Sequence, residues 1–193
     1  MDSRQAFREL KEGKIRPLYV LYGTETYLIN EFVQRLTDLV AEPDDRDMAL
    51  VRFDTAETPL DAVVEEAETL PFLAPRKLVL VRDQALFAAG KETGKIEHRP
   101  DRLLDYMKAP PETTVLVFVV PQEKLDERKK LVKAVKSADA AVPFSPLSAE
   151  ELQRWLMRRA EKQGRRFEPD AALELLRRTG ADMHALAAET DKL

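Results

Sequence analysis

One segment near the start of the chain, Pro17–Val33, constrains the fold more than any other. It reads PLYVLYGTETYLINEFV. The apolar run Leu18–Tyr22 has the length and composition of a buried strand, and Gly23 follows it directly. From Leu28 onward, apolar residues recur at four-residue spacing, as on one face of a helix. A strand, a glycine turn and a helix in this order are typical of the first unit of a nucleotide-binding α/β domain.

The same segment lacks the residues that hold phosphate in such a domain. A P-loop reads G-x-x-x-x-G-K-[ST], in which backbone N–H groups surround the phosphates, the lysine meets their oxygens and the hydroxyl meets Mg²⁺. If the pattern starts at Gly23, its second glycine is replaced by Leu28. Ile29 and Asn30 stand at the lysine and hydroxyl positions, and Glu25 adds a negative charge where triphosphate would lie. We therefore expect a degenerate loop that binds no nucleotide, and we expect no cofactor.

Apolar runs and helical patterns alternate as far as Phe144. The strand-like runs after the first are Ala49–Phe53, Lys77–Val81, Thr114–Val120 and Ala141–Phe144. The helical patterns are Ser3–Lys11, Glu25–Val40, Leu60–Leu70, Arg102–Lys108 and Asp126–Ser137. Parallel strands that are buried on both faces do not alternate in polarity, and Lys77–Val81 and Thr114–Val120 are nearly uniformly apolar. The pattern predicts an α/β domain over residues 1–144 with a mostly parallel, helix-covered sheet.

The pattern becomes entirely helical after Pro143–Pro146. Ser148 and Glu151 have the spacing of a capping box, which starts a helix. The predicted helices are Ala149–Lys162, Pro169–Arg178 and a third from Asp182 to the end. They predict a small three-helix domain over residues 145–193. The last helix meets no stop signal, so we expect the chain to be cut within or just after it.

Charge and composition exclude several classes of protein. The net charge of −4 gives no strong field toward nucleic acid or a membrane. The absence of cysteine excludes disulfides and thiolate metal sites and agrees with a cytoplasmic location. The longest apolar run, Val115–Val120, is far shorter than the ~20 residues of a spanning helix. The charged start also lacks the apolar core of a secretory signal.

Signals of catalysis are weak. His98 and His184 are far apart and have no cluster of metal ligands near them in the sequence. No serine lies in a G-x-S-x-G context. We expect no catalytic residue and no metal site.

Four strings in the chain resemble one family. They are PLYVLYGTETYLINE, LPFLAPRKLVLVRD, TTVLVFVV followed by LDERKKLVK, and FSPLSAEELQRWL followed by GADMHALAAETDKL. Their order and spacing are similar to those of the δ subunit of the bacterial DNA polymerase III clamp loader. The resemblance implies an AAA+ (RecA-like) domain that does not use ATP, a helical lid domain, and a third, collar domain that this chain lacks.

The resemblance also implies a function. Members of this family bind the ring-shaped sliding clamp and hold one of its interfaces open, so that it can be loaded on DNA during replication. They act as non-catalytic components of the DNA polymerase III holoenzyme, a DNA-directed DNA polymerase and so a nucleotidyltransferase complex. The other loader subunits would be partners through the collar domain.

Phe72 and Leu73 are the strongest candidates for a functional site. They lie between Pro71 and Pro75, just after the predicted helix Leu60–Leu70. From the residues alone, they are either a projecting apolar plug for a partner's pocket or a cap on the core. The resemblance favours clamp contact, because the family's apolar pair falls in this turn. In the family the pair is a leucine and then an aromatic residue, whereas here the aromatic comes first.

Basic side chains leave two interpretations open. Lys129, Lys133 and Lys136 share one face of a predicted helix, which is either simply solvated or in contact with the phosphates of primer–template DNA. A second basic set has the same two interpretations: Arg154, Arg158, Arg159, Lys162, Arg165 and Arg166. Arg76, Lys77 and Arg82 flank a strand and are expected to be solvated; the alternative is contact with an acidic surface of the clamp. The alternative functions are a divergent P-loop NTPase or kinase and a nucleic-acid-binding module.

Overall fold

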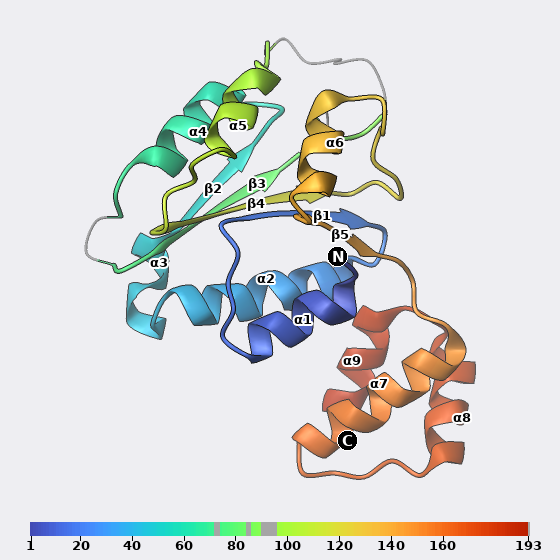
Figure 1. Ribbon diagram of the computed structural model, residues 1–193. Coiled ribbons are helices and arrows are strands. Elements are labelled where there is room, and N and C mark those ends of the chain that lie inside the picture. Colours follow the sequence, from blue (N-terminus) through green and yellow to red (C-terminus); the bar gives the residue numbers. More distant parts are fainter. Residues whose placement is uncertain (72–73, 84–85, 90–95, 193) are drawn as a thin grey trace. The chain divides into compact units, whose positions relative to one another are not determined.

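The computed structural model describes residues 1–71, 74–83, 86–89 and 96–192. The chain divides into two compact units, Met1–Ser145 and Pro146–Leu193. The first unit contains a sheet covered by helices, and the second is helical (Figure 1).

The first unit is built on one parallel sheet. Within the described residues its strands are β1 (Leu18–Gly23), β2 (Leu50–Asp54), β3 (Lys77–Arg82), β4 (Thr114–Val120) and β5 (Ala141–Phe144). They lie in the order β2-β3-β4-β1-β5, and each neighbouring pair is parallel. Parallel neighbours need long crossover connections, which the helices supply. This is the architecture of an AAA+ type α/β domain, and the predicted fold is confirmed.

Helices cover both faces of the sheet (Figure 1). One face carries α4 (Leu60–Glu68), α5 (Pro100–Tyr106) and α6 (Lys130–Ser137). Their apolar stripes pack on the strands in one cluster that includes Val63, Leu103, Leu116, Phe118 and Val132. The other face carries α1 (Ser3–Lys11) and α2 (Thr26–Val40).

Four aromatic rings pack edge to face beneath the end of β5. Phe32 of α2 lies 5.3 Å from Tyr19 and 5.8 Å from Phe144 between ring centroids. Phe7 of α1 lies 5.4 Å from Phe32 and 6.1 Å from Phe144. Such rings contribute both a large buried area and a preferred geometry. They hold β1 and the end of β5 against α1 and α2.

Several predicted element boundaries are wrong; helix α5, for example, is Pro100–Tyr106 and not Arg102–Lys108. A 3₁₀ turn, Pro43–Asp45, and a short helix α3, Arg46–Ala49, precede β2 and are too short to show a helical period. Helix α6 starts at Lys130 rather than Asp126, because the Asp126 carboxylate accepts the Arg128 N–H at 3.1 Å and forms a local turn. Helix α4 ends at Glu68, two residues before the predicted Leu70.

The second unit consists of α7 (Ala149–Lys162), α8 (Pro169–Thr179) and α9 (Met183–Asp191). The capping box is formed: Glu151 N–H donates to Ser148 Oγ at 3.3 Å, and Ser148 N–H donates to the Glu151 carboxylate at 2.8 Å. The core of the unit contains Leu152, Leu156, Ala172 and Leu186. Trp155, which the pattern predicts in this core, is only partly buried, and the Arg159 guanidinium lies 5.6 Å from its ring.

Candidate functional site

The turn between β1 and α2 is closed by backbone contact with β5. Gly23 has φ +135°, and a Cβ there would lie 2.0 Å from the Phe144 carbonyl oxygen. Only glycine fits such a position. The Glu25 N–H then donates to the same carbonyl at 3.1 Å. Because α2 already starts at Thr26, the helix begins inside the stretch where a P-loop would still be open.

The N-terminus of α2 carries its own anion. The Glu25 carboxylate accepts the Tyr27 N–H at 3.3 Å, and Glu25 is only 9% exposed. A helix N-terminus attracts phosphate through its free N–H groups and its dipole. In this chain a carboxylate already lies there, and its charge would repel a phosphate.

The other predicted loop residues serve packing or solvation. Leu28 and Ile29 are buried in the core against the sheet, and Asn30 is exposed. None of them brings a positive charge to the turn. That the degenerate loop of Gly23, Leu28, Ile29 and Asn30 binds no nucleotide stays a prediction.

Asp83 lies just after β3, at the same carboxyl edge of the sheet as Gly23. In P-loop NTPases an aspartate of the Walker-B motif holds Mg²⁺. Here the fully buried Asp83 carboxylate accepts from the Thr55 hydroxyl at 3.1 Å and from the N–H groups of Leu86 and Phe87 at 2.9 and 3.0 Å. The side chain ties Leu86 and Phe87 to the end of β3, a role that the sequence pattern did not reveal. Among the described residues, no three histidines or acids are grouped to hold a metal ion.

The second feature of interest is the end of α4. The predicted pair Phe72 and Leu73 lies outside the described residues. Just before the pair, Leu70 is 80% exposed, although the helical pattern predicts it on the buried stripe. Thr69 leaves helical geometry with φ −71° and ψ 153°, so Leu70 no longer follows the helix.

Lys77 holds this helix end. The sequence pattern predicts a solvated side chain here, and that prediction is wrong. Its side chain is only 3% exposed. The ammonium donates to the Glu66 carbonyl, to Glu66 Oε1 at 2.7 Å and to Thr69 Oγ1 at 2.5 Å. A cation at a helix C-terminus complements the dipole and satisfies terminal carbonyls. The sequence does contain one signal of this burial: along the strand, Lys77 lies on the same face as the inward residues Val79 and Val81.

The start of α4 is held by His98. Its Nδ1 accepts the Leu60 N–H at 3.2 Å, and His98 is 8% exposed. Because the N-cap residue is Pro59, it offers no side-chain oxygen for this role. The histidine therefore has a structural role as a capping group.

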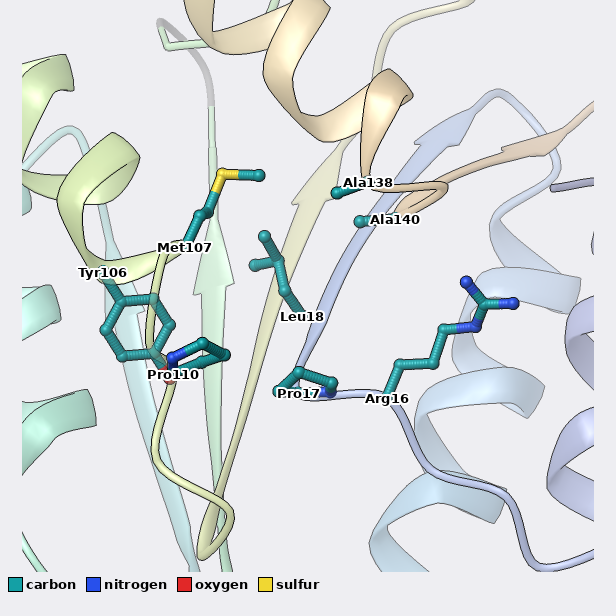
Figure 2. Close-up of a pocket in the computed structure, with 8 residues that line it drawn as sticks. All are labelled: Arg16, Pro17, Leu18, Tyr106, Met107, Pro110, Ala138 and Ala140. Atoms are coloured by element: carbon teal, nitrogen blue, oxygen red, sulfur yellow. The ribbon is translucent and has the colours of Figure 1, made fainter.

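A pocket of about 220 Å³ lies at the opposite, amino-terminal edge of the sheet (Figure 2). Its lining is Arg16, Pro17, Leu18, Tyr106, Met107, Pro110, Ala138 and Ala140. Figure 2 shows the Arg16 side chain extending away from the apolar residues, and its guanidinium pairs with Glu9 at 2.7 Å. Burial raises the pKa of Tyr106 to about 12, with a smaller contribution from Glu68. The pocket is apolar and brings together no acid–base pair or nucleophile.

The basic residues of the α6 region are partly engaged within the chain. Lys136 pairs with Glu127, and Arg128 pairs with Asp126 at 2.8 Å. Lys133 is exposed and Lys129 is half-buried. In the second basic set, the Arg159 guanidinium donates to both carboxylate oxygens of Asp191 in α9, at 2.7 and 2.8 Å. DNA contact through Lys129, Lys133 and Lys136 stays a prediction.

No helix in the described part of the chain combines the length and the apolar character needed to cross a membrane.

Comparisons with known proteins agree with the resemblance. The family model described as "DNA polymerase III, delta subunit" matches residues 19–144. DNA polymerase III subunit delta of Bacillus subtilis is 36% identical over 187 residues, which are 97% of this chain and 54% of that protein. The solved structure of the Bacillus subtilis DNA clamp loader delta protein matches with a TM-score of 0.85 and 35% identity, over 98% of this chain and 56% of that one.

A more distant structure shows the fold alone. It is a DNA polymerase III gamma subunit-related protein from Thermotoga maritima, with a TM-score of 0.51 and 16% identity, over 99% of this chain and 57% of that one. The chain spans about half the length of the Bacillus subtilis relatives, 54% and 56%. With its AAA+ type sheet, closed loop and matching family model, the chain belongs to the DNA polymerase III delta subunit family.

Proposed function

We propose that this chain binds a sliding clamp through the surface that follows α4 and favours the clamp conformation in which one ring interface is open. Phe72 and Leu73 would be the central contacts. Family membership supports the proposal, since the structure with a TM-score of 0.85 is a clamp loader delta protein. The chain would act as a part of the DNA polymerase III holoenzyme without catalysis of its own.

The observation that carries the proposal is the exposure of Leu70. A leucine that is 80% exposed, at a helix end held by buried side chains, is costly to leave in water. Exposed apolar side chains that gather in one place mark interaction sites, and a few such anchors supply most of the binding free energy. Leu70 is followed directly by Pro71, Phe72 and Leu73, so the three apolar side chains come just after α4 in the sequence.

The mechanism would be differential binding. A protein that binds two clamp states equally shifts nothing between them, however tightly it binds. Opening therefore requires that the surface after α4 fits an open interface better than a closed one. ATP would act on neighbouring subunits, because here Gly23, Glu25 and Asp83 are occupied by internal contacts.

The remaining partners follow from the family. Other clamp-loader subunits are further proposed partners. Primer–template DNA is a further proposed contact of Lys133 and its neighbours. The location would be the cytoplasm.

Binding to the cognate clamp tests the proposal directly. Calorimetry would compare the closed clamp ring with a clamp monomer whose ring interface is broken by mutation. We expect binding to both and tighter binding to the monomer. Leu39→Ala, at a leucine that is 43% exposed on α2, serves as a matched control that should leave both affinities unchanged. A chain that binds neither form would contradict the proposal, and equal affinities would contradict the opening mechanism.

A further inference from the structure

We propose that Lys77 is a positioning residue for the partner-binding surface: it ends α4 at Glu68 and so turns Leu70 outward, toward the clamp. This inference rests on the proposed function, because it assumes that the surface after α4 is the contact surface. It assigns a specific role to a side chain that otherwise only begins β3.

Among the described residues, the acceptors of the Lys77 ammonium lie together at the end of α4. The Nζ atom donates to the Glu66 carbonyl, to the Glu66 carboxylate at 2.7 Å and to Thr69 Oγ1 at 2.5 Å. Thr69 Oγ1 in turn donates to the Glu66 carbonyl at 2.8 Å. A buried ammonium must find such acceptors, because unpaired charge is strongly disfavoured away from water. The last turn of α4 therefore stays bound to Lys77, because an unpaired ammonium at this buried position would be strongly unfavourable.

The other end of this link is rigid. Lys77 N–H donates to the Thr113 carbonyl at 2.9 Å, and Lys77 pairs with Thr114 at the start of the parallel ladder between β3 and β4. The backbone of Lys77 is thus fixed by the sheet. Its side chain transmits that position to the end of α4.

Lys77 also acts where the helix stops. In a continuing α-helix the N–H of Leu70 would donate to the carbonyl of Glu66, four residues earlier. That carbonyl instead accepts from Lys77, from the Thr69 hydroxyl and from the Thr69 N–H at 3.2 Å. Pro71 adds to this effect, because a proline disfavours helical geometry at the residue before it. Lys77 and Pro71 together oppose the apolar spacing that would turn Leu70 inward, and Leu70 is 80% exposed.

Four single variants of the 193-residue chain test the inference. Lys77→Met keeps the length of the side chain and removes the charge, and Lys77→Arg restores a donor for the same acceptors. Val79→Ala, at a fully buried residue two positions along β3, lowers stability without touching the end of α4. Leu70→Ala, alone and with Lys77→Met, tests coupling. If Lys77→Met does not fold, Thr69→Val removes one acceptor at an exposed position and takes its place.

Two measurements are made on each variant: affinity for the cognate clamp and amide hydrogen exchange of residues 66–70 in the free chain. For Lys77→Met we expect about tenfold weaker clamp binding, as when the competent conformation falls to about one tenth. The rates of amide hydrogen exchange at the end of α4 should change together with the clamp affinity. Lys77→Arg should restore most of the affinity, and Val79→Ala should keep it while its melting temperature falls. Leu70→Ala should cost less affinity in the Lys77→Met background than alone, since coupled residues are not additive.

The inference is overturned if Lys77→Met binds the clamp as the unchanged chain does, or if Val79→Ala weakens binding as much as Lys77→Met. It is also overturned if exchange of residues 66–70 is the same in Lys77→Met and in the unchanged chain. Failure of the unchanged chain to bind any clamp is a different result. It overturns the proposed function and with it the clamp-directed part of this inference, while the exchange data report separately on the helix end.

Discussion

The Cα of Gly23 lies so close to Phe144 that a Cβ would stand 2.0 Å from the Phe144 carbonyl oxygen. The contact joins the ends of β1 and β5, and the same carbonyl accepts the N–H of Glu25 at 3.1 Å. One pair of residues thus explains both the glycine and the closure of the loop. A turn with the layout of a phosphate loop can thus use its first glycine for packing.

Gly23→Ala should lower the free energy of unfolding by about 3 kcal/mol, from the clash and from the strained φ together. Gly13→Ala is the matched control, because Gly13 also has positive φ (+73°) but no atom lies within 4 Å of a Cβ there. It should cost about 1 kcal/mol. Urea unfolding measures both. Equal losses would show that the contact with Phe144 is not the cause.

The chain should not bind ATP–Mg²⁺ in calorimetry at millimolar nucleotide. Glu25→Ala should not create binding, because the turn still lacks a lysine and an open loop. It should lower the free energy of unfolding by about 1 kcal/mol, the usual effect of losing a helix cap. Saturable ATP binding by the unchanged chain would revive the NTPase interpretation.

Two buried tyrosines should respond in opposite ways to loss of the hydroxyl. The Tyr106 hydroxyl is buried with no hydrogen-bond partner among the described residues, whereas the Tyr19 hydroxyl accepts the Arg16 N–H at 2.9 Å. Tyr106→Phe should leave stability unchanged or raise it by about 1 kcal/mol, and Tyr19→Phe should lower it by about 1 kcal/mol. Thermal and urea unfolding of the pair would check this. Destabilisation by Tyr106→Phe would reveal a partner for that hydroxyl.

Glu9 should make stability depend on acid pH. Its carboxylate accepts two bonds from the Arg16 guanidinium, at 2.7 and 2.8 Å, and this holds its pKa at about 2, below the ordinary 4.5. Because the pKa of Glu9 is lower in the folded state, its ionised carboxylate stabilises the fold fully above pH 4.5. This stabilisation is lost as the pH falls toward 2. Glu9→Gln should cost about 1–2 kcal/mol at neutral pH and progressively less in acid.

Urea unfolding from pH 6 down to about 2.5 would follow this difference, because the range covers the ordinary pKa of 4.5 and most of the interval down to the lowered native pKa. Glu12→Gln is the control, because the Glu12 carboxylate pairs only with the exposed Lys14 among the described residues. Its effect should be near zero at every pH. A pH-independent difference between Glu9→Gln and the unchanged chain would contradict the assignment.

Much of the fold could be predicted from the sequence because its signals are local. Thr114–Val120 is a uniformly apolar run, and Ala149–Lys162 is bounded by a capping box and a glycine; both elements have the predicted bounds. The alternation of such elements is enough to predict a parallel sheet.

The residues that shape the end of α4 could not be predicted in this way. Lys77 is charged and flanks a strand, so solvation is its ordinary state; its burial depends on acceptors that only the fold brings near. Leu70 continues a helical period that tertiary contacts interrupt. His98 likewise acts on the backbone N–H of another segment, and Asp83 accepts from the Thr55 hydroxyl of another segment; neither contact has a sequence signature.

The most direct test of the account is the double variant Phe72→Ala and Leu73→Ala, measured for both clamp affinity and thermal stability. If each side chain is an anchor worth about 2 kcal/mol, clamp affinity should fall roughly a thousandfold at ~1.4 kcal/mol per decade. The melting temperature should stay close to that of the unchanged chain. Either a large drop in melting temperature, as for two buried side chains, or unchanged clamp binding by a well-folded double variant would contradict the assignment of Phe72 and Leu73 as the clamp contact.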